Sequence, residues 1–131
     1  MMKERTFILQ ATIPANAPAN TIVPVSITVD PIEGPKNTQQ VPQQQSWVVS
    51  DIYVTGSPAV DGIITLFKNR DIIVGATAPI STTLVTNPSR TTISKKVYGP
   101  TEVMSATYTT LAANGATAAT VTAYAKVVIF E

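Results

Sequence analysis

This chain is rich in β-branched residues. Threonine, valine and isoleucine make up 48 of its 131 residues, whereas leucine occurs only four times. β-Branched side chains are stiff about χ1 and pack well on a pleated sheet, while helical domains use more leucine, glutamate and lysine. Ten prolines lie mostly between the apolar runs, where they end regular structure. The residue choice therefore predicts an all-β chain.

Alternation of apolar and polar residues marks the individual strands. It is clearest over residues 120–129, where the odd-numbered positions are apolar, and over residues 47–54. In the second of these strands the predicted core residues are Val48, Ile52 and Val54, and the opposite face carries Trp47, Val49, Asp51 and Tyr53. Further strands are predicted at residues 6–13, 21–29, 62–68, 71–76, 81–86, 91–98 and 102–111.

The segments between the strands read as turns and loops. Asn114-Gly115 is a turn dipeptide. Residues 31–45 hold three prolines, one glycine and six Gln/Asn, which predicts a long exposed loop, and residues 1–5 read as a short charged tag. We therefore expect one domain over residues 1–131. Eight or nine short antiparallel strands predict a β-sandwich, with a jelly roll favoured over an immunoglobulin-like arrangement because the cysteine pair of antibody domains is missing.

The sequence lacks the residues that most chemistry needs. It has no histidine and no cysteine, which removes the commonest general base, the commonest metal ligand and the thiolate nucleophile. Asp30, Glu33, Asp61 and Asp71 fit no metal-binding spacing and are interpreted as turn and strand-end residues. No nucleophile elbow or glycine-rich phosphate loop is present. We expect no catalytic residues, no metal site and no cofactor, so the chain is not expected to be an enzyme.

The charge pattern limits the partners. The net charge is +1, and the one pair of adjacent basic residues is Lys95 and Lys96, which does not favour direct binding to nucleic acid. No apolar run approaches the length of a membrane span. The run Phe7-Ile8-Leu9 ends at Gln10 and is too short for the core of a signal peptide. These features predict a protein made and kept in the cytoplasm, or one exported by another route.

Several features favour assembly with other subunits. Charged residues make up 13% of the chain, about half of the usual ~25%. The predicted outer strand faces carry threonine, serine and alanine more than lysine and glutamate, and both ends of the chain read as strands, whose edges can pair with neighbours. We predict a homo-oligomer whose partners are itself and other structural subunits. The candidate assembly contacts are Phe7, Ile8, Leu9, Trp47 and Tyr53.

Three segments give the chain a family resemblance: residues 47–53 (WVVSDIY), residues 61–64 and 69–72 (DGII and NRDI), and the close of the chain at residues 127–130 (VVIF). In these it resembles the small single-jelly-roll capsid and decoration (cement) proteins of icosahedral viruses of bacteria and archaea. The resemblance implies a virion location with assembly in the host cytoplasm. It also implies many identical copies that meet through strand edges, loops and termini. A basic arm is missing, which leaves genome contact to another component.

Two alternatives stay open at this point. One is a subunit of an extracellular filament or tube, assembled by exchange of a terminal strand. The other is a carbohydrate- or ligand-binding sandwich, in which Trp47 and Tyr53 would form an aromatic platform beside Asp51. Core packing and a subunit contact are competing interpretations of the same two aromatic residues.

Overall fold

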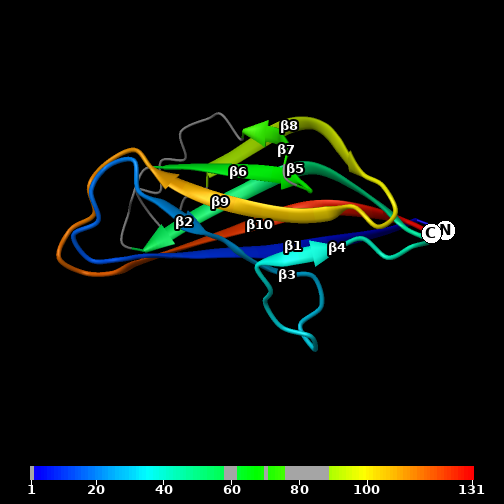
Figure 1. The fold of residues 1–131 in the computed structure, drawn as a ribbon, viewed down its shortest axis with the longest axis horizontal. Coiled ribbons are helices and arrows are strands. Elements are labelled where there is room, and N and C mark those ends of the chain that lie inside the picture. Colours follow the sequence, from blue (N-terminus) through cyan, green and yellow to red (C-terminus); the bar gives the residue numbers. More distant parts are fainter. Residues whose placement is uncertain (1, 58–61, 70, 76–88) are drawn as a thin grey trace.

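The computed structural model describes residues 2–57, 62–69, 71–75 and 89–131, with the backbone alone for 53–57, 71–75 and 89–96. These residues form strands and connecting loops without any helix, as the sequence predicts (Figure 1). The strands are β1 (Met2–Ile13), β2 (Ile22–Pro24), β3 (Ser26–Thr28), β4 (Thr38–Gln40), β5 (Ser46–Ser57), β6 (Gly62–Lys68), β7 (Asp71–Gly75), β8 (Ser89–Tyr98), β9 (Val103–Thr110) and β10 (Ala119–Phe130).

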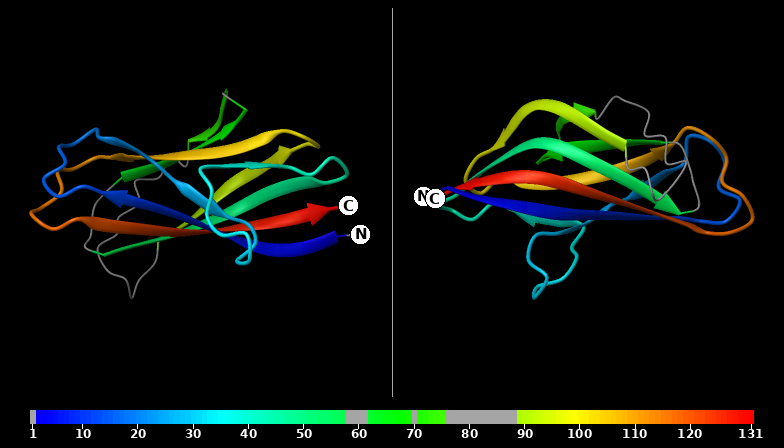
Figure 2. Two further views of the ribbon diagram at one scale, coloured as in Figure 1. Left: turned by 60° about the horizontal axis from the view of Figure 1, so that its bottom comes forward. Right: turned by 180° about the vertical axis from the view of Figure 1, so that it is seen from behind.

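The strands form two antiparallel sheets. One has the order β3-β1-β10-β5-β8, and the other has the order β2-β9-β6-β7 with β4 also paired to β9. The first and last strands pair along their whole length, from Met2 opposite Phe130 to Ile13 opposite Ala119. Both ends of the chain therefore lie side by side at one end of the molecule (Figures 1 and 2).

The strand order separates two kinds of sandwich. Many neighbouring strands in the two sheets are distant in sequence, such as β1 and β10, β5 and β8, and β2 and β9, whereas β6 and β7 are consecutive. In an immunoglobulin-type sandwich the first and last strands lie in different sheets, whereas here β1 and β10 are neighbours in one sheet. The observed order is consistent with the jelly roll that the sequence favoured.

A single apolar core lies between the two sheets. Alternate residues of β1 and β10 point into it, because successive side chains of a strand project to opposite faces, and both strands show the matching pattern of buried and exposed positions. The largest fully buried side chains are Tyr98, Tyr108, Phe7, Leu9, Ile13, Ile27, Ile52, Ile64, Leu66, Met104 and Val25. Phe7 and Trp47 meet edge to face, with their ring centroids 5.0 Å apart.

The segment predicted as a long exposed loop is partly ordered into the sheets. Within residues 31–45, Thr38–Gln40 forms β4, and Val41 is buried in the core. Lys36 also exchanges backbone hydrogen bonds with Ile27. The prediction was wrong here because a three-residue strand between prolines leaves almost no periodicity to detect. The loop between β3 and β4 projects from the body of the sandwich in Figure 1.

Other strand boundaries shift by small amounts. The charged residues 3–5 continue β1 and are not a separate tag, since each pairs with a residue of β10. The strand predicted at residues 21–29 is divided into β2 and β3 by Val25. The strand predicted at residues 81–86 lies outside the described residues. At Asn114-Gly115, Gly115 has no positive φ, so the dipeptide does not form the turn expected of an Asn-Gly pair.

The predicted core face of β5 was right at Ile52 and wrong at Val48, and the side chain of Val54 lies outside the described part. Trp47 and Val49 are buried, and so is Ile52, whereas Val48 is only half-buried on the other face. Along β10, Val127 pairs with Val49 but Lys126 pairs with Asp51, so one extra residue lies in β5 between them. A bulge of this kind reverses the side-chain alternation beyond it. The local pattern could not reveal the bulge, because it depends on pairing with a distant strand.

Candidate functional site

The five predicted assembly contacts do not form one surface in the structure. Phe7, Leu9 and Trp47 are buried in the core of the single chain, with exposed fractions of 0–2%. Ile8 is half-buried, between Thr28 of β3 and Tyr124 of β10. The backbone of Tyr53 pairs with Tyr124, and its side chain lies outside the described part. Contacts of these residues with neighbouring subunits stay a prediction.

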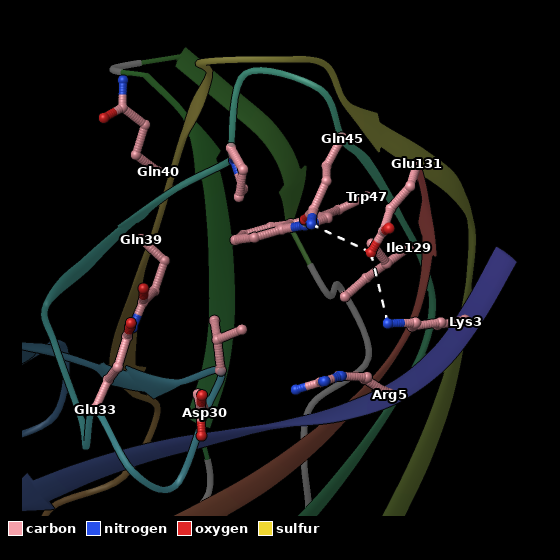
Figure 3. Close-up of a pocket in the computed structure, with 12 residues that line it drawn as sticks. Lys3, Arg5, Asp30, Glu33, Gln39, Gln40, Gln45, Trp47, Ile129 and Glu131 are labelled. Carbon is pink, nitrogen blue, oxygen red and sulfur yellow. Dashed lines mark hydrogen bonds and ion pairs between the residues drawn. The ribbon is translucent and has the colours of Figure 1, made fainter. Parts of the chain in front are cut away.

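A cavity of about 300 Å³ opens at the end of the sandwich where the two chain ends meet (Figure 3). Its walls come from the start of β1, the end of β10, the start of β5 and the segment from Val29 to Gln45. The polar lining residues are Lys3, Arg5, Asp30, Glu33, Gln39, Gln40, Gln45 and Glu131, and Trp47 contributes an indole edge. Local sequence patterns do not reveal this cavity, because its residues meet only through long-range pairing.

Hydrogen bonds and ion pairs hold most of this lining in place. The indole N–H of Trp47 donates to Gln45 Oε1 at 3.2 Å, and the side-chain amide of Gln45 donates to Glu131 at 3.5 Å. Glu131 also lies 3.7 Å from Lys3 Nζ (Figure 3). These links fix the indole as a wall of the cavity. Trp47 is 2% exposed, so it offers no open face for a sugar ring.

The charges around the cavity are mixed. Lys3 pairs with Glu131, and Glu33 lies 3.7 Å from Lys36. Asp30 Oδ1 accepts a hydrogen bond from the backbone N–H of Ile32 at 2.9 Å. The side chain of Arg5 is exposed and forms neither an ion pair nor a hydrogen bond with any described residue. The described residues bring no three Asp or Glu side chains together in a geometry that would hold a metal ion.

A second candidate surface is the outer face of the β1-β10-β5-β8 sheet at the same end. The register sets Val128, Val48 and Val97 in one row across three strands, and Met2 and Phe130 in the next row. Met2 is 66% exposed, Val97 is 52% exposed and Phe130 is 43% exposed. Contiguous exposed apolar residues of this kind often mark contact sites between proteins.

An ion pair borders this apolar surface. Lys126 Nζ lies 2.8 Å from Glu4 Oε1 on the outer face of β10 and β1. The face therefore combines apolar side chains with a neutralised charge pair, which is the composition expected of a protein contact more than of a binding site for nucleic acid. No helix long and apolar enough to cross a membrane occurs among the described residues.

Comparison with known proteins finds a protein that is similar in sequence. The chain is 28% identical over 117 residues to the capsid protein VP4 of Sulfolobus polyhedral virus 1, and the match covers 82% of this chain. The matched region spans 65% of the length of VP4, so the chain corresponds to less than two thirds of that relative. No family model matches the chain.

The fold of this chain shows a weak likeness to a solved structure, the virus-like particle of the extra small virus of the prawn Macrobrachium rosenbergii. The match covers 97% of this chain and 79% of that chain, with 12% identity and a TM-score of 0.40. A likeness at this level supports no inference about function.

Proposed function

We propose that this protein is a structural subunit of a viral capsid, which assembles in many copies and contacts its neighbours through strand edges, loops and outer sheet faces. The observation that carries the proposal is the similarity to VP4, because it extends over most of this chain and is not confined to one short motif. The antiparallel sandwich and the low content of charged residues agree with it. The proposal includes a location in the virion and no enzymatic role.

The arrangement of β1 bears on the filament alternative. Strand exchange between subunits needs a groove that a neighbour's strand can fill. Here the chain fills the place beside β10 with its own β1, through twelve paired residues. Exchange would require the whole of that pairing to break first. The closed arrangement therefore favours assembly of preformed subunits over assembly by exchange of the first strand.

The burial of Trp47 weakens the alternative of a ligand-binding sandwich. A sugar platform needs an aromatic face open to solvent, and the Trp47 side chain is instead packed against Phe7 and hydrogen-bonded to Gln45. Because Trp47 lies in the core, it cannot form the aromatic platform on which the carbohydrate site was predicted. A shell subunit needs no such platform.

The test is the assembly state of the purified chain. Light scattering coupled to size-exclusion chromatography should detect large oligomers as concentration or salt rises, and electron microscopy should then show closed shells. Phe130→Glu, on the outer apolar face, should raise the concentration needed for assembly by about tenfold or more, because it places a charge in a contact. Ile32→Glu places the same charge on the projecting loop, where Ile32 is 93% exposed, so comparing the two variants separates a contact of the outer face from a contact of the loop.

Three results would count against this proposal. A chain that stays monomeric under all conditions is not a self-assembling subunit. Fibres in place of shells would support the filament alternative. If Phe130→Glu and Ile32→Glu assemble as well as the unchanged protein, the outer face is not a contact even though the chain assembles.

A further inference from the structure

One side of the first half of β1 has no neighbouring strand in the described part of the chain. β10 pairs with every residue of β1, whereas β3 pairs only with residues 8–10. β3 ends at Thr28, and the chain turns away at Asp30. Residues 2–6 are exposed, and in the left view of Figure 2 they lie at the margin of the sheet. The sheet therefore has an open edge at this place.

The backbone hydrogen bonds of β3 show which groups of β1 point toward that edge. Ile27 exchanges both of its backbone bonds with Lys36, at 2.7 and 3.0 Å, so it makes none with β1. β3 therefore bonds to β1 through Ser26 and Thr28, the residues on either side of Ile27, and Thr28 lies opposite Ile8. Because the direction of backbone groups alternates along a strand, Glu4 and Thr6 point their N–H and C=O groups to the same side as Ile8. These groups can template the addition of another strand.

Two residues of this same edge line the cavity at the chain ends. Lys3 and Arg5 alternate with Glu4 and Thr6 on β1, and both point into the cavity (Figure 3). A strand that paired with the edge would project every second side chain to the same face of the sheet as Lys3 and Arg5. One such side chain would therefore enter the cavity. In strand addition the backbone bonds supply affinity and pockets of this kind supply specificity.

The unused polar groups in the cavity define the side chain that fits. The guanidinium of Arg5 has only donors and no partner among the described residues, whereas the carboxylate of Asp30 has only acceptors and is engaged by a single backbone N–H. The other charges, on Lys3 and Glu33, already have partners of opposite sign. A carboxamide offers an acceptor oxygen to Arg5 and a donor nitrogen to Asp30, and it adds no charge.

A second copy of the same edge is a poor occupant. In antiparallel pairing of β1 with another β1, residues that point the same way must lie opposite each other. When two β1 strands pair about Lys3, Glu4 or Arg5, the central residue lies opposite its own copy in the other strand. At least one pair of like charges then faces each other, and such pairs destabilise a sheet. The charge pattern thus disfavours pairing of two β1 edges and favours a neutral segment.

We propose that the edge formed by residues 2–6 of β1 binds an extended, uncharged segment of another polypeptide, with a glutamine or asparagine side chain in the cavity beside Arg5 and Asp30. The proposal goes beyond assembly of shells, because the edge and the cavity are complete in the single chain. Its test therefore uses the monomeric protein.

The experiment is a titration of the ¹⁵N-labelled protein with blocked heptapeptides in which threonine and valine alternate around a central residue. With central glutamine, the amide resonances of Glu4 and Thr6 should shift and their hydrogen exchange should slow. Peptides with central alanine, glutamate or lysine should bind about tenfold more weakly, because each leaves Arg5 or Asp30 without its partner. Arg5→Met should remove the preference for glutamine.

Thr6→Pro tests the backbone part of the proposal. It deletes an N–H that has no partner strand in the single chain, and proline is tolerated at such edge positions. The variant should keep its fold and lose peptide binding. If Thr6→Pro does not fold, Glu4→Pro removes the preceding edge N–H in the same way.

The proposal is overturned if no peptide moves the β1 resonances at millimolar concentration, because Lys3 and Arg5 then act only as charges that protect the edge from aggregation. It is equally overturned if Thr6→Pro binds normally, or if the charged peptides bind as tightly as the glutamine peptide. Each result is independent of whether the unchanged protein forms shells.

Discussion

Gly62 of β6 is packed against an aromatic ring, which makes its replacement a sensitive test of the fold. Tyr108 on the neighbouring strand lies opposite Ile64, and its ring reaches diagonally over Gly62. A Cβ added at Gly62 would lie 2.5 Å from Tyr108 Cε1 and closer still to Cζ and the hydroxyl oxygen. Tyr108 is fully buried in the core, so its ring could move aside only by displacing other packed side chains.

Gly62→Ala should therefore destabilise the protein. Overpacking of a core typically costs about 1–3 kcal/mol, and the gain from replacing a strand glycine by alanine offsets about 0.4–1 kcal/mol of that. Because the overlap is with a fully buried ring, the cost should lie in the upper part of that range, leaving a net cost of about 1–2.5 kcal/mol, or a fall of about 4–10 °C in melting temperature for a domain of this size. Thermal unfolding followed by circular dichroism measures it.

Two variants control this prediction. Gly115→Ala should be neutral or slightly stabilising, because no atom lies within 4 Å of the added Cβ and the φ of Gly115 is not positive. In a Tyr108→Leu background the ring is gone, so Gly62→Ala should cost less than it does in the unchanged protein. If Gly62→Ala is as stable as the unchanged chain, the close packing of Tyr108 on β6 is wrong.

Three other substitutions test separate contacts. Asn114→Ala should cost about 1–3 kcal/mol in urea unfolding, because the buried side chain donates to Pro14 and Thr117 carbonyls at 2.9 and 3.0 Å; equal stability would contradict that network. Burial, and secondarily the charge of Glu102, raise the pKa of Tyr98, so the folded state keeps a proton that the unfolded state loses. Stability should then fall as pH rises above about 10, by up to about 1.4 kcal/mol per pH unit, and Tyr98→Phe should flatten that fall. Trp47→Ala should cost about 3–5 kcal/mol as a core truncation; an unchanged melting temperature would mean that the indole is not in the core.

Local pattern was enough to predict a large part of the fold. β6 runs from Gly62 to Lys68 as its alternation predicts, and β10 differs from the prediction by a single residue at each end. The extra residue at the bulge beside each of these strands lies in the partner, β7 or β5, so period-2 alternation within β6 and β10 maps onto burial. The predicted contacts Phe7 and Leu9 are also on one face of β1, but that face is the core. Alternation shows which residues share a face and leaves open what covers it.

The sequence by itself determined the all-β class, the position of most strands and the lack of imidazole and thiol chemistry, because these depend on residue type and on neighbours along the chain. The tertiary structure decided the pairing of β1 with β10, the bulge that turns Trp47 inward, and the meeting of Arg5 with Asp30 around one cavity. Each of these depends on register between strands far apart in sequence. A shift of one residue in such a register exchanges the two faces of a strand, and no local pattern records it.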